Sequence, residues 1–207
     1  AIFMLLTRTF ASYGVEHLKP AAAYVALTVV LLLVFLFVGY PAFIAVFAHL
    51  NPFKFAKKIT RVAVFGFSTS SSAATLPLNV KTTVEELGVD EKIASFVLPL
   101  GMTINMNGTA IMQVIATLFI AGCAGYSISF TQLVVIALLA LIASAGTPAA
   151  PGSGAIILFT ILSGLGYVND AAMLAYSLIL AINRPIEMLV TALNVVGDSA
   201  TSIYVAK

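Results

Sequence analysis

The sequence predicts an all-α membrane protein in which two re-entrant helical hairpins lie among transmembrane helices. Of its 207 residues, 61% are hydrophobic and only 9% are charged, whereas charged residues make up about a quarter of a typical soluble domain. No Asp, Glu, Lys or Arg occurs from residue 93 to residue 169, a stretch much longer than the about 20 residues that one helical crossing needs. Two clusters of small and polar residues interrupt the apolar segments, and each marks a predicted hairpin turn.

The first two elements are predicted to be transmembrane helices. Residues 1–12 carry no initiator Met and are interpreted as the end of a transmembrane helix whose beginning is missing. Residues 18–50 form a longer apolar stretch that can span a bilayer with some tilt, and Pro41 can kink it. Four cations with no acid among them follow, at Lys54, Lys57, Lys58 and Arg61. The positive-inside rule places this end of the helix on the cytoplasmic side.

Residues 53–91 are predicted to form the first re-entrant hairpin. Within them, residues 68–77 read Ser-Thr-Ser-Ser-Ser-Ala-Ala-Thr-Leu-Pro and separate two arms that are each too short to cross a bilayer. Irregular backbone at membrane depth is tolerated only inside protein or beside a cavity, so this turn is a candidate site. The alternative is a serine-rich loop at the surface.

Residues 93–125 are predicted to form an interrupted transmembrane helix. Its centre, residues 101–109, reads Gly-Met-Thr-Ile-Asn-Met-Asn-Gly-Thr, and Gly and Asn weaken a helix. Asn and Thr oxygens, together with freed backbone carbonyls, are the uncharged oxygen ligands that a hard cation prefers. Helix packing through small residues is the alternative.

Residues 130–167 repeat the pattern of the first hairpin. Their centre, residues 146–154, reads Gly-Thr-Pro-Ala-Ala-Pro-Gly-Ser-Gly, a density of Pro and Gly that cannot continue a helix. This segment is predicted to be a second re-entrant hairpin with a mobile turn. Short or broken segments in corresponding positions of two halves indicate a secondary transporter with its substrate site between them.

The last predicted transmembrane helix, residues 171–205, carries one polar stripe. At 100° per residue its members fall within about 60° of arc. They are Glu187, Thr191, Asn194 and Asp198. An ionisable side chain at bilayer depth costs several kcal/mol unless it is paired or faces a cavity. The stripe is therefore the predicted site of a bound ion or solute.

Four segments together resemble the signature elements of the sodium:dicarboxylate and amino-acid symporter family, the glutamate transporters. They occur in order and at fitting spacings, as Ser-Ser-Ser-Ala-Ala-Thr-Leu-Pro at 70–77, Asn-Met-Asn-Gly-Thr at 105–109, Gly-Thr-Pro-Ala-Ala-Pro-Gly-Ser-Gly at 146–154 and Asn-Val-Val-Gly-Asp at 194–198. The resemblance covers essentially the whole chain, as the second half of the family's sequence. It implies an elevator fold in which this transport domain slides against a trimeric scaffold and the second hairpin is the outer gate.

The resemblance also implies two sodium sites. The first falls on Gly101, Asn105, Asn194 and Asp198. The second lies under the gate hairpin, mostly through backbone carbonyls, on Thr103, Met106, Ser144, Ala145 and Thr147. The carboxylate of Asp198 would offset the desolvation of the ion, and Asn194 would contact both ion and substrate, so that each stabilises the site of the other. No organic cofactor is expected.

The substrate pocket that the resemblance implies consists of Ser72, Thr109, Ala150, Pro151, Gly152, Glu187, Thr191 and Asn194. Glu187 stands where the family places the acid that binds the substrate ammonium, and backbone N–H groups at the hairpin turns would bind its carboxylate. Arg184 is a further candidate, because its side chain can reach the pocket or pair with Glu187 three residues later.

Three residues depart from the family's pattern. Val190 stands where transporters of acidic amino acids carry an arginine that pairs bidentately with the side-chain carboxylate, which argues against an unmodified glutamate or aspartate site. Asn107 replaces an aspartate of many sodium-coupled members, which puts a third sodium site in doubt and makes a proton an alternative coupling ion. Glu187 replaces the usual aspartate, and its extra methylene favours a smaller substrate.

The sequence therefore predicts a cation-coupled symporter of amino acids or dicarboxylates rather than an enzyme, with sodium as the expected driver and a small or neutral amino acid as the preferred substrate. An acidic amino acid bound with help from Arg184 is the first alternative, and an ion channel is the second. A metal-dependent membrane hydrolase would need a His or acid cluster, and His17 and His49 lie outside the polar core. We expect a multi-pass, lipid-embedded homotrimer of the plasma membrane. A net charge of +2 gives no reason to expect nucleic acid.

Overall fold

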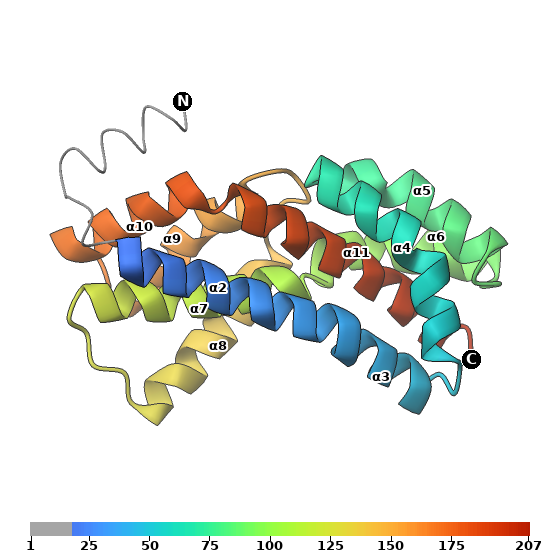
Figure 1. Ribbon diagram of the computed structural model, residues 1–207, viewed down its shortest axis with the longest axis horizontal. Helices are drawn as coiled ribbons and strands as arrows, with labels where there is room; N and C mark the ends of the chain where they lie inside the picture. The colour runs from blue at the N-terminus through green and yellow to red at the C-terminus, as the bar shows by residue number, and fades with distance from the viewer. Residues whose placement is uncertain (1–17) are drawn as a thin grey trace.

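The computed structural model describes residues 18–207, so the helix end predicted for residues 1–12 lies outside the described part. Residues 18–207 are mostly helical, and no strand occurs among them (Figure 1). The helices in chain order are α2 (Leu18–Val34), the π-helical turn η2 (Phe35–Gly39), α3 (Tyr40–Val46), α4 (Pro52–Thr69), α5 (Ser72–Glu85), α6 (Glu91–Ile104), α7 (Asn107–Cys123), α8 (Phe130–Ala145), α9 (Ser153–Leu165), α10 (Asp170–Ile182) and α11 (Arg184–Val205).

The first long helix continues through its proline. Pro41 is in the first turn of α3 and has no N–H to donate to the carbonyl of the preceding turn. The π-helical turn η2 lies directly before it and accommodates the missing bond, so that α2, η2 and α3 form one long rod (Figure 1). Within residues 18–207, three helical stretches are long and apolar enough to cross a membrane, namely Pro20–Val46, Glu91–Cys123, which comprises α6 and α7, and Arg184–Val205.

Two pairs of helices lie where the hairpins are predicted. Hairpin 1 consists of α4 and α5, which lie side by side and are joined at the first tip, Ser70–Ser71 (Figure 1). Ser70 has a left-handed backbone with φ 50°, and Ser71 begins α5 by accepting a hydrogen bond from the Ala74 amide at 3.2 Å. Hairpin 2 consists of α8 and α9, joined at the second tip, residues 146–152. Gly152 closes that tip with φ 86°, a conformation that glycine adopts readily.

The structure breaks two of the helical segments. Between α6 and α7, Asn105 and Met106 have ψ values of 69° and 48°, so the helix is interrupted at its Asn-rich centre. The sequence predicts one helix over residues 171–205, but the structure divides it at Asn183 into α10 and α11. The physical reason is Pro185, which occupies the first turn of α11 and has no N–H to continue the bonding of α10. The polar stripe therefore lies entirely on α11.

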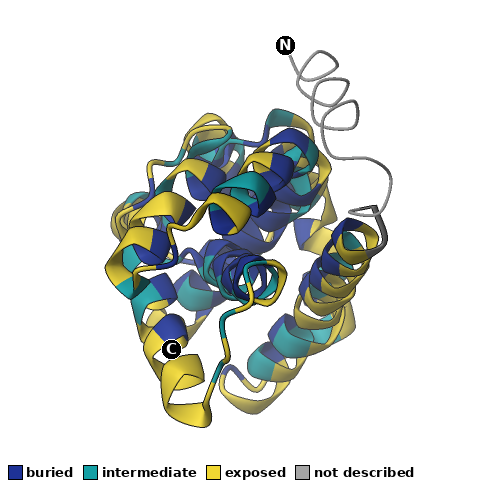
Figure 2. Cartoon of the chain, turned by 90° about the vertical axis from the view of Figure 1, so that its left-hand side faces the viewer, coloured by how far each residue is buried: buried dark blue, intermediate teal, exposed yellow. Residues whose placement is uncertain are grey.

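Helix α11 forms the centre of the assembly. Most of its side chains from Ile186 to Ile203 are buried, and it packs against α4, α6 and α7. Figure 2 shows that buried residues face the interior of the helix bundle and that exposed residues lie on its outside. Polar side chains of hairpin 1 form hydrogen bonds with buried polar groups of α11. Asn79 Nδ2 donates to the Val195 carbonyl at 3.0 Å, and the Thr83 hydroxyl lies 3.0 Å from the Ser199 hydroxyl.

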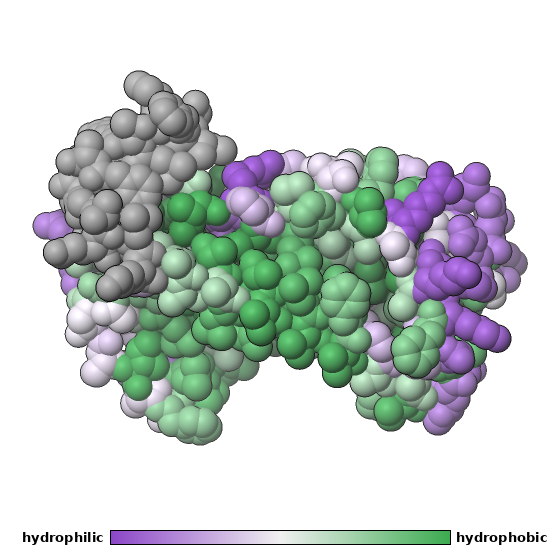
Figure 3. Space-filling model, in the orientation of Figure 1, coloured by the Kyte–Doolittle hydropathy of each residue, from purple (hydrophilic) through white to green (hydrophobic). Residues whose placement is uncertain are grey.

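The outer surface divides into an apolar band and a hydrophilic end. Large apolar side chains of the first rod are exposed, including Leu27, Val30 and Phe37. Figure 3 shows a broad apolar face across the middle of the molecule, whereas hydrophilic residues gather on the right, where α4 begins and α5 leads into α6. An apolar face of this extent is typical of helices that contact lipid. The fold is that of a membrane protein, and re-entry of the hairpins from one side stays a prediction.

Candidate functional site

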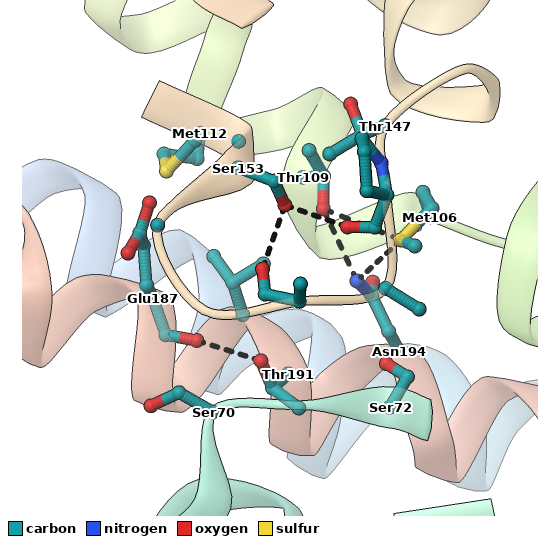
Figure 4. Close-up of a pocket in the computed structure, with 16 residues that line it drawn as sticks. Ser70, Ser72, Met106, Thr109, Met112, Thr147, Ser153, Glu187, Thr191 and Asn194 are labelled. Carbon is teal, nitrogen blue, oxygen red and sulfur yellow. Dashed lines mark hydrogen bonds between the residues drawn. The ribbon is translucent and has the colours of Figure 1, made fainter. Parts of the chain in front are cut away.

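A small pocket lies where the two tips, the break between α6 and α7, and the first half of α11 come together (Figure 4). Its volume is about 30 Å³, which is room for only a few water molecules. The wall consists of Ser70, Ser72, Met106, Thr109, Met112, Thr147, Pro148, Ala149, Ala150, Gly152, Ser153, Gly154, Glu187, Val190, Thr191 and Asn194.

Seven of the nine residues predicted for the substrate site line this pocket, namely Ser72, Thr109, Ala150, Gly152, Glu187, Thr191 and Asn194. Pro151 is not part of the wall and lies exposed at the second tip. Arg184 also lies outside the wall, at the first residue of α11. Ser70 and Ser153 belong to the wall but were missed, although both lie in the tip motifs that the sequence singles out.

Hydrogen bonds between the two tips close the pocket. The Ser71 hydroxyl donates to the Ala149 carbonyl at 2.9 Å, and the Ala73 amide approaches the same oxygen at 3.5 Å. At the second tip, the Ser153 hydroxyl donates to the Pro148 and Ala150 carbonyls. An amino acid is far larger than this volume, so binding one requires part of the pocket wall to move.

Glu187 is a buried carboxylate that is fully engaged. Oε1 accepts a hydrogen bond from the Ala155 amide at 3.3 Å, in the first turn of α9, and Oε2 accepts one from Arg184 Nη1 at 3.2 Å. The positive end of the α9 dipole and the guanidinium therefore both face this carboxylate. Only 8% of the Glu187 side chain is exposed, against 43% for Arg184. Of the two uses that the sequence leaves open for Arg184, the structure shows the pairing with Glu187.

Asn194 ties α11 to the first turn of α7. Its Oδ1 accepts from the Gly108 amide at 2.8 Å, and its Nδ2 donates to the Thr109 hydroxyl at 3.1 Å. A methyl group on Gly108 would lie only 2.9 Å from the Val190 carbonyl, so only glycine allows the two backbones to approach this closely. The amide of Asn194 is thus held in place at the pocket wall.

Three of the four residues predicted for the first sodium site meet around one buried carboxylate. Asp198 is 2% exposed, and its Oδ1 accepts from Asn105 Nδ2 at 2.9 Å. Gly101 lies against it, because a methyl group there would be 2.7 Å from the same oxygen. Asn194, the fourth member, lies one helical turn earlier on α11 and contacts α7 instead. The arrangement places a buried carboxyl group against the side-chain amide of Asn105 and the backbone of Gly101.

The residues predicted for the second sodium site are less closely gathered. Met106 and Thr147 meet at the pocket wall, and Ser144 is buried. Thr103 and Ala145, by contrast, are exposed. The hydroxyls of Ser144 and Thr147 both donate to backbone carbonyls of α8, at 2.9 Å in each case. Each of these hydroxyl oxygens keeps lone pairs that can contact a cation, so binding through backbone carbonyls stays a prediction.

A tyrosine that the sequence analysis missed completes the polar cluster around Asp198. The Tyr40 hydroxyl accepts from Asn107 Nδ2 at 3.2 Å, and the same nitrogen donates to Asn105 Oδ1 at 2.7 Å. A chain of hydrogen bonds thus leads from Tyr40 through both asparagines to the carboxylate. Nothing in the local sequence around Tyr40 indicates this role, because its neighbours are apolar and its partners lie far along the chain.

Comparisons with known proteins agree with this arrangement. A model of the sodium:dicarboxylate symporter family matches residues 1–207. The chain is 34% identical to excitatory amino acid transporter 1 of Rattus norvegicus over 178 residues, which are 86% of this chain and 32% of that protein. It is 37% identical to excitatory amino acid transporter 2 of Homo sapiens over 149 residues, 72% of this chain and 25% of that protein. An excitatory amino acid transporter of Caenorhabditis elegans is 37% identical over 150 residues, 72% of this chain and 29% of that protein. The chain thus spans about a quarter to a third of the length of these relatives.

Proposed function

Because the chain belongs to the sodium:dicarboxylate symporter family, we propose that the protein is a secondary active symporter that moves an acidic amino acid together with a cation, with sodium as the coupling ion. Members of this family are transporters rather than enzymes. One observation carries the proposal for this chain. The buried carboxylate of Glu187 lies in a pocket enclosed by both hairpin tips, and a second buried carboxylate, Asp198, lies three turns further along the same helix.

The proposed substrate is an acidic amino acid, whereas the sequence by itself favours a small or neutral one. The family description names dicarboxylates, and the relatives are named excitatory amino acid transporters. An acidic amino acid is a dicarboxylate that also carries an ammonium group, so it suits both descriptions. The sequence-based preference for a neutral substrate rested on Val190, which does line the pocket. A cation for the second substrate carboxylate therefore has to come from another position.

The polar groups of the pocket divide into two sets with different partners. Glu187 would bind the substrate ammonium, while Asn194 and the amides at the two tips would bind the α-carboxylate. Asp198 with Asn105 and Gly101 would hold sodium, whose charge offsets the buried carboxylate. Asn194 lies between the two sets, so binding of ion and substrate would reinforce each other.

Transport would require the hairpins and the whole domain to move. Hairpin 2 would be the gate, because only hydrogen bonds from Ser71 and Ala73 to Ala149 tie its tip to hairpin 1 among the described contacts. The domain would slide as an elevator within a homotrimer in the plasma membrane, as the family resemblance implies. The exposed apolar face of the first rod would meet lipid or a scaffold rather than water.

Uptake by proteoliposomes that contain the purified protein tests this function. Labelled aspartate should accumulate when an inward sodium gradient is imposed, and an ionophore that collapses the gradient should abolish accumulation. A proton gradient without sodium separates the two coupling ions. If labelled aspartate, alanine and succinate all fail to accumulate under either gradient, symport is the wrong function.

A further inference from the structure

The guanidinium of Arg184 lies beside the pocket rather than in its wall. Its Nη1 is 3.2 Å from Glu187 Oε2. On its other side is the second tip, since a methyl group on Gly152 would lie 3.9 Å from the same nitrogen. Gly152 and Glu187 are both wall residues. Arg184 therefore stands at the edge of the pocket, between the carboxylate proposed to bind ammonium and the tip proposed to move.

The two members of the Arg184–Glu187 ion pair differ in how firmly they are held. Glu187 keeps a second hydrogen bond from the Ala155 amide at 3.3 Å, and little of its side chain is exposed. Arg184 donates a single hydrogen bond to the carboxylate, and 43% of its side chain is exposed. A group that enters the pocket would therefore displace the guanidinium and leave the carboxylate in place.

We propose that Arg184 is a specificity-determining residue that exchanges ionic partners when substrate binds. The incoming ammonium takes its place on Glu187, and the released guanidinium pairs with the distal carboxylate of an acidic amino acid. This inference rests on the proposed function. It supplies the cation that the pocket lacks at Val190, a wall residue that is 5% exposed and apolar. Every ionic group is paired before and after the exchange.

The charges of Arg184 and Glu187 determine which class of substrate the exchange favours. Before binding, one cation and one anion neutralise each other. An acidic amino acid offers an ammonium to Glu187 and a carboxylate to Arg184, and its α-carboxylate remains for the tips. A neutral amino acid leaves Arg184 without a carboxylate. A dicarboxylate without an amine brings two negative charges toward Glu187 and offers that residue no cation, so like charges repel. The expected order of affinity is acidic amino acid, then neutral amino acid, then plain dicarboxylate.

Equilibrium binding of aspartate, asparagine and succinate to the purified protein in saturating sodium tests the exchange. Aspartate and asparagine have nearly the same shape but differ in the distal charge. Arg184→Gln removes the cation, and Arg184→Lys keeps it without the planar fork. Lys81→Gln is the matched control, because Lys81 also pairs with an acid of its own helix, Glu85, at 4.0 Å, but is exposed on α5.

The unmodified protein should bind aspartate about ten- to a hundredfold more tightly than asparagine, the range expected for one hydrogen bond between charged groups. Arg184→Gln should remove most of this ratio by weakening aspartate while asparagine is unchanged or tighter. Arg184→Lys should keep part of the ratio, and Lys81→Gln all of it. A merely structural role would lower both affinities by the same factor.

Two results overturn the exchange. One is an unchanged ratio of aspartate to asparagine in Arg184→Gln, and the other is equal affinity for the two ligands in the unmodified protein. The second result is decisive even when the variant does not fold. Failure of the proposed function gives a different outcome, because then no ligand of the panel binds and none is accumulated.

Discussion

Replacing Gly197 with alanine should destabilise the protein, because three elements meet at this glycine beside the proposed ion site. A methyl group there would overlap Tyr40 Oη and would lie 2.7 Å from Tyr40 Cζ and 2.8 Å from Asn105 Nδ2. The tyrosine cannot retreat freely. It is 6% exposed, its hydroxyl accepts from Asn107 at 3.2 Å, and its ring packs edge-on against Phe35 at 5.2 Å between centroids.

The size of the effect follows from three contributions. Overpacking a tightly filled site costs about 1–3 kcal/mol. Moving the tyrosine also breaks its hydrogen bond, which costs about 0.5–1.5 kcal/mol more. Alanine returns about 0.5–1 kcal/mol through its higher helix propensity. Taking the middle of each range, the free energy of unfolding should fall by about 2 kcal/mol.

Unfolding of the purified protein in detergent, followed by circular dichroism, measures this change. Gly164→Ala is the matched control, because Gly164 lies within α9 and a methyl group there meets no atom within 4 Å. That variant should be as stable as the unmodified protein or slightly more so. Adding Tyr40→Ala to Gly197→Ala should cost less than the sum of the two single changes, since it removes two of the clashing atoms. Equal stability of Gly197→Ala and Gly164→Ala would refute the tight packing of Tyr40 and Asn105 against Gly197.

Two further substitutions test contacts at the pocket and below it. Ser71→Ala removes both a helix cap, worth about 1 kcal/mol, and the hydrogen bond to Ala149, so amide exchange at the second tip should accelerate. Ser129→Ala removes a comparable cap from α8 without touching the first tip, and equal acceleration in both variants would argue against a latch between the tips. Tyr24→Phe leaves the buried Asn183 Oδ1 without its donor at 2.7 Å, which should lower the free energy of unfolding by about 1–3 kcal/mol. An unchanged unfolding midpoint would show that this bond does not support the junction of α10 and α11.

Local chemistry in the sequence predicted most of the helical elements. Asn and Gly residues weaken a helix by themselves, so the break between α6 and α7 could be predicted at Asn105. The break at Asn183 was missed because the apolar pattern continues through it, although Pro185 is a helix-start signal. The apolar pattern alone predicts one continuous helix, and Pro185 breaks it.

The candidate site was predictable where it follows one helix and not where it depends on packing. The spacing of Glu187, Thr191 and Asn194 places them on one face, and all three line the pocket. Tyr40 reaches the cluster only because α3 packs beside the break. The exposure of Thr103 is likewise set by how the helices pack, which no local pattern specifies.

The central claim is that α11 holds a substrate half at Glu187 and an ion half at Asp198, coupled through Asn194. Measuring aspartate affinity across sodium concentrations, and sodium affinity across aspartate concentrations, tests it most directly. Each ligand should strengthen the other by the same factor. Asp198→Asn, whose side-chain oxygen can still accept from Asn105, should abolish that factor, whereas Glu187→Gln should weaken aspartate and leave sodium binding intact. Equal loss of both ligands in both variants, or a full sodium effect in Asp198→Asn, would contradict the account.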